Sequence, residues 1–196
     1  MPAVPPDLAV VMAARAGDSA AFGSLMAAHK TRVFAMAAKY ARNHHELEDL
    51  AQDIFIKAWK GLASYRGDAP FEHWLMRVAV RACFDFLRRN RNRREHEVSR
   101  DALMEAGHFP AEGIHAGTAL EENHALLEVR RAMSLLSPKE QHVLTLLELE
   151  DRPVKEVASL TGWSEANVKV RAFRARQALR KCIERLRQSQ SRGPLS

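Results

Sequence analysis

Residues 47–94 read LEDLAQDIFIKAWKGLASYRGDAPFEHWLMRVAVRACFDFLRRNRNRR, and the organisation of the whole chain follows from this stretch. Apolar residues recur in it at spacings of three and four, the pattern of helices that each bury one face. A short polar break at 65–70 separates two such helices. The buried face of the first comprises Leu47, Leu50, Ala51, Ile54, Phe55 and Ala58, and that of the second comprises Phe71, Trp74, Leu75, Val78, Ala79, Ala82 and Phe86.

The remaining faces of these two helices differ in chemistry. The first helix carries mainly polar side chains there: Asp49, Gln52, Asp53, Ile56 and Lys60. Because a solvated face needs no isoleucine, this face could bind a partner protein. The second helix ends in five arginines within seven residues: Arg88, Arg89, Arg91, Arg93 and Arg94. Such a basic end can bind nucleic-acid phosphates.

Charge is distributed unevenly along the chain. The 196 residues suffice for one ordinary domain or two small ones, and the net charge of +6 favours a polyanionic partner. Residues 101–129 contain six acidic residues and no Lys or Arg, whereas residues 164–187 contain eight basic and two acidic residues. These numbers indicate two basic modules separated by an acidic segment.

Several classes of protein are disfavoured by the sequence. Cys83 and Cys182 lie in separate helical patterns, which favours free thiols in a reducing cytoplasm over a disulfide framework. No apolar run approaches the roughly 18 residues that span a membrane, and no signal peptide is recognisable at the start, so we expect a cytoplasmic protein without membrane insertion. The histidines match no metal-ligand spacing, and catalytic motifs and phosphate-binding loops are lacking. We therefore expect no metal, no cofactor and no enzymatic activity.

The fold expected from these patterns is all-α, with two small helical domains joined by a flexible linker. In the first domain, residues 1–95, Asp7 and Asp18 can cap two helices, of which the second runs to about Arg42, and a turn follows at 43–46. Residues 96–119, with three glycines in 96–120, are predicted to form the acidic linker. Its acids either keep it solvated or line a groove that otherwise holds nucleic acid.

The second domain, residues 120–196, is predicted to contain a helix-turn-helix. A helix to Leu136 precedes a capping box at 137–140, and a break follows at 151–153. Ala158 is small where two helices cross, Gly162 suits a turn with positive φ, and Val168 can pack the second helix back onto the first.

The second helix of this motif has the features of a recognition helix. Ser164 can cap it, and its exposed side would offer Glu165, Asn167, Lys169, Arg171, Arg174 and Arg176. A helical hairpin with a solvated basic face is the alternative. Phe173 could be half exposed and touch a thymine methyl, or it could be core; Trp163 is better explained by packing.

Together, the two modules resemble the extracytoplasmic-function (ECF) group of bacterial RNA polymerase sigma factors in the sigma-70 family. Residues 48–59 and 65–79 carry the resemblance most specifically, and the helix at 168–176 supports it. The resemblance implies a sigma factor that binds core RNA polymerase and directs promoter recognition and melting. The alternatives are a stand-alone helix-turn-helix regulator and an adaptor whose basic faces bind an acidic protein.

The resemblance also implies roles for individual residues. The first module would bind the β′ clamp helices of the polymerase through Asp49, Gln52, Asp53 and Phe55, although a plain solvated face is the alternative. The loop after that helix and the basic helix beyond it would open the minus-ten element and hold a flipped base, through Tyr65, Arg66, Asp68, Phe71, Trp74, Arg77, Arg81, Arg88 and Arg89. Tyr65 could instead be core, and the arginine run could serve only solubility.

The second module would bind the β flap and the minus-thirty-five element, the latter through Ser164, Glu165, Asn167, Lys169, Val170, Arg171, Phe173, Arg174 and Arg176. Arg81 stands where the group often has asparagine, and Val170 where a small polar residue is common. These two departures would alter promoter choice rather than binding itself. The resemblance further implies an anti-sigma factor as a partner and a linker that threads into the polymerase.

Overall fold

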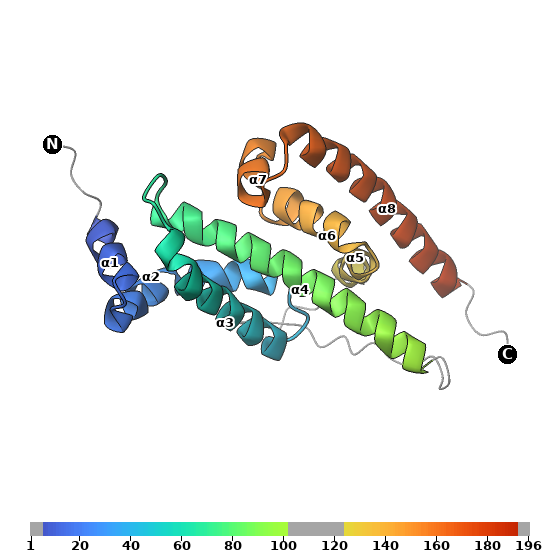
Figure 1. The fold of residues 1–196 in the computed structure, drawn as a ribbon. Helices are drawn as coiled ribbons and strands as arrows, with labels where there is room; N and C mark the ends of the chain where they lie inside the picture. Colours follow the sequence, from blue (N-terminus) through green and yellow to red (C-terminus); the bar gives the residue numbers. More distant parts are fainter. Residues whose placement is uncertain (1–5, 102–123, 192–196) are drawn as a thin grey trace. The chain divides into compact units, whose positions relative to one another are not determined.

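The structure is a computed structural model that describes residues 6–101 and 124–191 (Figure 1). Within these ranges the chain forms helices and no strands, in two compact units, one in each range. The predicted all-α fold with two helical domains is therefore confirmed.

The first unit contains four α-helices and one short 3₁₀ helix. They are α1 (Pro6–Arg15), α2 (Ser19–Ala38), α3 (His44–Gly61), η1 (Leu62–Ser64) and α4 (Phe71–Asp101). Helix α2 packs against α1, α3 and α4, and α3 packs against α4. The core between them is filled by large apolar side chains that are almost completely buried, among them Val33, Met36, Leu50, Ile54, Leu62 and Val80.

Two helix starts in this unit follow from side-chain caps. The Asp18 carboxylate accepts the backbone N–H groups of Ala20 and Ala21 at 2.8 and 3.1 Å, as its position in the sequence predicted. The predicted extension of α2 to Arg42 and the turn at 43–46 are wrong. Helix α2 ends at Ala38 instead, and α3 begins at His44 because the side chain of Asn43 accepts the backbone N–H of Glu46 at 2.8 Å.

Helix α4 is longer than the sequence pattern indicated. It continues to Asp101 and so includes the first six residues assigned to the linker. Residues 91–101 contain neither glycine nor proline, and their Arg and Glu residues are good helix formers, so nothing in them ends the helix. The rest of the predicted linker lies outside the described residues.

The second unit contains α5 (His124–Ser134), α6 (Pro138–Leu144), the π-helical turn η2 (Thr145–Leu149), α7 (Val154–Thr161) and α8 (Glu165–Ser191). The capping box at the start of α6 is present: Glu140 N–H donates to Ser137 Oγ at 3.4 Å, and Ser137 N–H donates to the Glu140 carboxylate at 2.9 Å. Leu120, the predicted start of α5, lies outside the described residues.

The π-helical turn was not predicted, because apolar spacing does not distinguish it from an α-helix. Glu150 N–H donates to the carbonyl of Thr145, and Arg152 N–H donates to that of Leu146 at 3.1 Å. Asp151 then adopts φ +49°, a left-handed conformation that aspartate tolerates better than most residues. The turn at the predicted break, 151–153, thus connects η2 to α7.

His142 lies in the core of the second unit, and its burial lowers its pKa to about 3. The unfolded chain, with an ordinary histidine, binds the proton near pH 6.5, so the folded state binds fewer protons between pH 6.5 and 3. We therefore expect the second unit to lose stability as the pH falls through this window, by at most about 1.4 kcal/mol per pH unit. Urea unfolding measures this loss in a variant with Trp59→Phe and Trp74→Phe, whose fluorescence comes from Trp163 alone; the Trp163 ring lies 6.1 Å from that of His142.

The variant His142→Gln is the control for this pH dependence, because it keeps a polar side chain but removes the titrating group. Its unfolding free energy should vary less with pH between 6.5 and 4. Equal pH dependence in the variant and the natural protein would assign the acid sensitivity to other groups.

Two further expectations concern membranes and thiols. None of the helices that the structure describes is long and apolar enough to cross a membrane. Cys83 is buried and Cys182 is half-buried, and both are thiols. Cys83 thus belongs to the core of the first unit.

Candidate nucleic-acid interface

The helix-turn-helix lies where the sequence predicted it. Helix α7 ends at Thr161 and is capped by Gly162, which has φ +77° and donates its N–H to the carbonyl of Ala158 at 2.9 Å. The hydroxyl of Ser164 accepts the N–H of Asn167 at 3.2 Å and caps α8. Val168 is completely buried and fixes α8 against the rest of the unit. Each of these residues thus has the local role that its type and spacing indicated.

The outer face of α8 combines polar, basic and apolar side chains. Exposed there are Glu165, Asn167, Lys169, Val170, Phe173, Arg174 and Arg176. Phe173 is 61% exposed, which decides the open question about this residue in favour of the surface. Trp163 is half-buried, in agreement with the packing explanation.

Four basic side chains of α8 were predicted to bind DNA, namely Lys169, Arg171, Arg174 and Arg176, and two of them are held by their own chain. Arg176 donates to the Glu148 carboxylate of η2 at 2.6 and 3.0 Å. The Arg171 guanidinium lies 4.6 Å from the centre of the Trp163 ring and donates to Asn167 Oδ1. Lys169 and Arg174 have no ion pair or hydrogen bond with another described residue, so their charges are the more available ones among these four residues.

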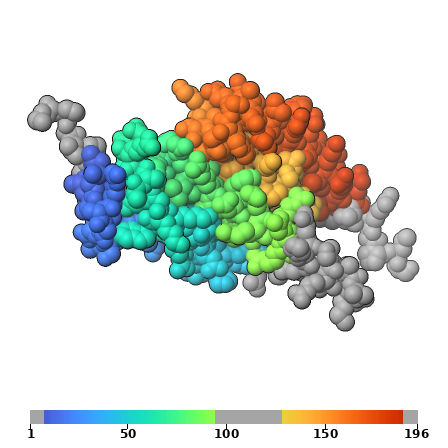
Figure 2. Space-filling model, viewed as in Figure 1, coloured from blue at the N-terminus to red at the C-terminus, as the bar shows by residue number. Residues whose placement is uncertain are grey.

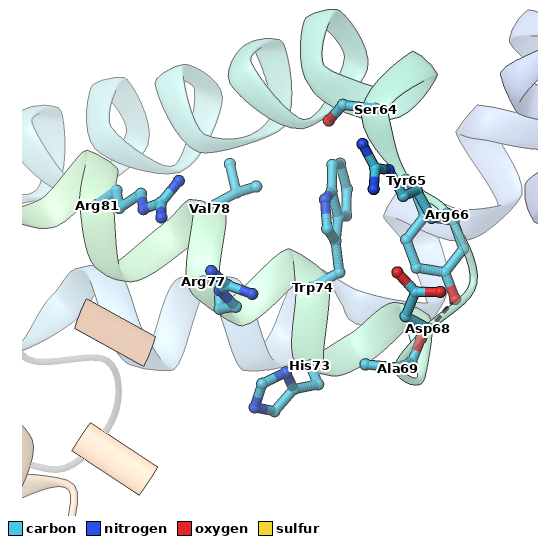
Figure 3. A pocket seen from close by; sticks show the side chains of 10 residues that line it. All are labelled: Ser64, Tyr65, Arg66, Asp68, Ala69, His73, Trp74, Arg77, Val78 and Arg81. Carbon is cyan, nitrogen blue, oxygen red and sulfur yellow. Dashed lines mark hydrogen bonds between the residues drawn. The ribbon is translucent and has the colours of Figure 1, made fainter. Parts of the chain in front are cut away.

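The first unit has a pocket where the 65–70 loop meets α4 (Figure 3). Its volume is about 250 Å³, and it is lined by Ser64, Tyr65, Arg66, Asp68, Ala69, His73, Trp74, Arg77, Val78 and Arg81. The pocket therefore combines an indole ring, three guanidinium groups and a carboxylate. Six of the nine predicted minus-ten residues lie together in it; Phe71, Arg88 and Arg89 do not.

Tyr65 and Phe71 lie at the two ends of the loop at 65–70. Both are buried, and their rings meet edge to face with centres 5.8 Å apart. The Tyr65 hydroxyl donates to the carbonyl of Ala69 at 2.7 Å, which closes the loop on itself (Figure 3). Burial raises the pKa of Tyr65, and the charge of Asp68 raises it further. The structure agrees with the core alternative for Tyr65; Trp74, half-buried, is the more accessible ring.

A basic stripe runs along α4 from the pocket. Arg77, Arg81 and Arg88 follow at spacings of four and seven, which places them on one face of the helix. Arg81 and Arg88 are exposed, and Arg77 is half-buried. Arg89 lies beside this stripe and is ion-paired with Asp53 of α3 at 3.0 Å.

The outer face of α3 contains three of the four residues predicted to bind a protein partner. Asp49 and Gln52 are exposed, and Asp53 is half-buried. Phe55 is only 7% exposed and points into the core, so it supports this face from inside and cannot be part of the folded surface. The place of Phe55 in the apolar repeat, which indicated burial, was thus a better guide than its place in the motif that resembles a polymerase-binding region.

Two apolar side chains accompany the polar ones on α3. Ile56 is 43% exposed, and Trp59, whose ring packs 4.7 Å from that of Phe22, is 38% exposed. Trp59 was not predicted to lie on this face, although its spacing of three from Ile56 could have shown it. Figure 2 shows that α3 and α4 both reach the surface of the first unit.

Burial would raise the pKa of the Asp53 carboxyl, but the hydrogen bond from Arg89 and the charge of Lys57 outweigh it and lower the pKa. Asp53 is thus a carboxylate at neutral pH. In the part of the chain that the structure describes, no group of three or more His, Cys, Asp or Glu side chains could hold a metal ion. His108 and His115 lie outside that part.

Comparison with known proteins identifies both units. Residues 25–93 match the family model Sigma-70 region 2, and residues 126–179 match Sigma-70, region 4. The first match contains α3, the pocket and the basic stripe, and the second contains the helix-turn-helix.

Curated relatives match over almost the whole chain. The ECF RNA polymerase sigma-E factor of Escherichia coli (strain K12) is 31% identical over 88% of this chain and 92% of the relative. The RNA polymerase sigma-H factor of Pseudomonas aeruginosa is 29% identical over 92% of this chain and 95% of the relative.

Two solved structures share the fold. One is CnrH in complex with the cytosolic domain of CnrY, with a TM-score of 0.54 and 23% identity over 91% of this chain and 97% of the other. The second is the sigma factor RpoE of Bartonella quintana in complex with the anti-sigma factor NepR, with a TM-score of 0.55 and 20% identity over 83% of this chain and 96% of the other. On the strength of the sigma-E match and of both sigma-70 regions, the chain belongs to the ECF group of sigma-70 family sigma factors, which bind core RNA polymerase and direct promoter-specific transcription initiation.

Proposed function

We propose that the three surfaces described above each bind a different partner of this sigma factor. The α3 face binds the β′ clamp helices, the pocket and the α4 stripe bind the minus-ten element, and α8 reads the minus-thirty-five element. The protein acts in the cytoplasm and catalyses no reaction itself. The observation that carries the proposal is the pocket of about 250 Å³, with a basic stripe leading away from it along α4.

The pocket suits a single unstacked base. It is smaller than the roughly 300–1,000 Å³ of pockets that enclose drug-sized ligands. Trp74 offers a stacking surface, and Arg66 and Asp68 offer a donor and an acceptor for base edges. Trapping the base offsets the few kcal/mol that unstacking costs. Arg77, Arg81 and Arg88 would hold the phosphates of the same strand.

The α3 face suits a basic helical partner with an apolar centre. The carboxylates of Asp49 and Asp53 can pair with cationic side chains, and Ile56 lies between them and Lys60 on the helix surface. An apolar centre with a polar rim is the usual arrangement of a protein interface. The clamp helices of the polymerase are the partner that the family implies.

On α8, Lys169 and Arg174 would contact bases or phosphates, and Val170 and Phe173 would contact thymine methyl groups. Arg81, where the group often has asparagine, would favour phosphate contact over base reading in the minus-ten element.

An anti-sigma partner is also part of the proposal, since both structural relatives are complexes, and NepR is named as an anti-sigma factor.

Run-off transcription with purified core polymerase on a library of promoter-like DNA tests the function. Transcripts that start at defined sites only when the protein is added are the expected result. If it neither supports transcripts nor binds core polymerase, and instead binds duplex DNA specifically by itself, the stand-alone regulator replaces the proposal.

For the pocket, we expect Arg81→Ala to reduce open-complex formation about tenfold, because it removes an exposed cation from the pocket rim and charge-assisted contacts contribute about 1.5–3 kcal/mol. Permanganate footprinting of unpaired thymines at a selected promoter measures this effect. Arg15→Ala, which removes an exposed cation from α1, is the matched control and should change little. Equal losses in the two variants would indicate a general charge effect rather than a site.

A further inference from the structure

A chain of ion pairs connects the α3 face to α4. The Asp53 carboxylate of α3 accepts a hydrogen bond from the Arg89 guanidinium of α4, with 3.0 Å between Oδ2 and Nη2. The same Oδ2 lies 3.3 Å from Lys57 Nζ, which in turn lies 3.2 Å from Asp85 Oδ2 on α4. Arg89, Asp53, Lys57 and Asp85 therefore alternate in charge between a surface for protein and a surface for DNA.

The two cations in this chain are held unequally. Lys57 lies between two carboxylates, so it keeps Asp85 if Asp53 is taken away. Asp53 is the partner of Arg89 among the described residues, and the Arg89 side chain is 57% exposed. A competing cation at Asp53 would therefore leave Lys57 paired but would release Arg89 into solvent.

We infer that core polymerase, by engaging the Asp53 carboxylate, releases Arg89 to bind a DNA phosphate, so that polymerase binding and promoter binding strengthen each other. This inference rests on the proposed role of the α3 face. In the free protein, the ion pair occupies both groups at once and weakens both interactions. Because such coupling is reciprocal, DNA on Arg89 also makes Asp53 more available to the polymerase.

The solvent exposure of these side chains limits the coupling free energy between the two binding events. Ion pairs between partly exposed side chains contribute about 0.2–1 kcal/mol, which corresponds to at most about a fivefold change in affinity. One additional phosphate contact to single-stranded DNA also steepens the dependence of log affinity on log salt by about 0.7. Both changes can be measured.

The first experiment measures DNA binding by the full-length free protein. Fluorescence anisotropy with labelled oligo(dT), at several salt concentrations, compares the natural protein with Asp53→Ala, Arg89→Ala and the double variant. We expect Asp53→Ala to bind about two- to fivefold more tightly, with a steeper salt dependence. Glu48→Ala, which removes an exposed carboxylate elsewhere on α3, measures the general effect of lost negative charge. The gain from Asp53→Ala beyond this control should vanish when Arg89 is alanine; a gain that persists there would overturn the inference.

The second experiment measures affinity for core polymerase without DNA. Asp53→Ala should weaken binding, whereas Arg89→Ala should strengthen it by about two- to fivefold, because it frees the Asp53 carboxylate. If Asp53→Ala has no effect, the proposed role of Asp53 fails. If Asp53→Ala weakens binding but Arg89→Ala does not strengthen it, the role of Asp53 stands and the coupling is refuted.

Discussion

Val168→Asp should unfold the second unit and abolish promoter-specific transcription. Val168 has no exposed surface, so the substitution buries a carboxyl group without a designed partner. Such changes cost about 4 kcal/mol or more, comparable with the whole stability of a small domain. Hydrogen exchange should show loss of protection in α7 and α8, whereas α2, α3 and α4 of the first unit keep theirs. Binding of core polymerase through the α3 face should survive in weakened form.

Val170→Asp is the matched control for this prediction, since it places the same charge two residues further along α8. Val170 is 50% exposed, so its substitution should change stability by no more than about 0.5 kcal/mol. It should nevertheless reduce DNA binding, because the new carboxylate would face phosphates. If Val170→Asp unfolds the unit as Val168→Asp does, the orientation of α8 described above is incorrect.

The sequence predicted the helix-turn-helix well because each of its residues has a purely local role. A glycine at positive φ, a serine cap and a buried valine are defined by backbone conformation and by helical spacing alone. For the same reason the capping box at Ser137 and the cap at Asp18 could be predicted. The family resemblance added the roles of these elements, which local chemistry does not contain.

The sequence was less informative about residues whose burial or partners depend on packing between separate segments of the chain. Phe55 belongs both to the apolar repeat and to the motif that resembles a polymerase-binding region, and only packing showed that it is buried. Tyr65 could have presented its ring to a base, but its hydroxyl is bonded to Ala69 within the loop. The pairs Arg89–Asp53 and Arg176–Glu148 join residues 36 and 28 positions apart, which no periodicity predicts.

Ile56→Asp should weaken binding of core polymerase by about 30-fold or more. Ile56 is 43% exposed at the centre of a face that otherwise consists of carboxylates, an amide, a lysine and the ring of Trp59, which is 38% exposed. Central apolar residues of an interface contribute most of its binding energy, typically 2 kcal/mol or more each, while the polar rim mainly excludes water. A carboxylate there would lose its hydration without gaining a partner. Competition between labelled natural protein and the variant for core polymerase measures the loss.

Met12→Asp is the matched control, because Met12 is 51% exposed and lies on α1 of the same unit, outside the α3 face. Both substitutions should leave the helical content unchanged, since an exposed aspartate costs a helix only about 0.7 kcal/mol relative to its best residue. A selective loss with Ile56→Asp would locate the polymerase contact on α3 and show that apolar burial, rather than charge alone, holds it. Equal affinity of both variants for the polymerase would instead place the contact elsewhere and leave Ile56 as an exposed apolar residue without a partner.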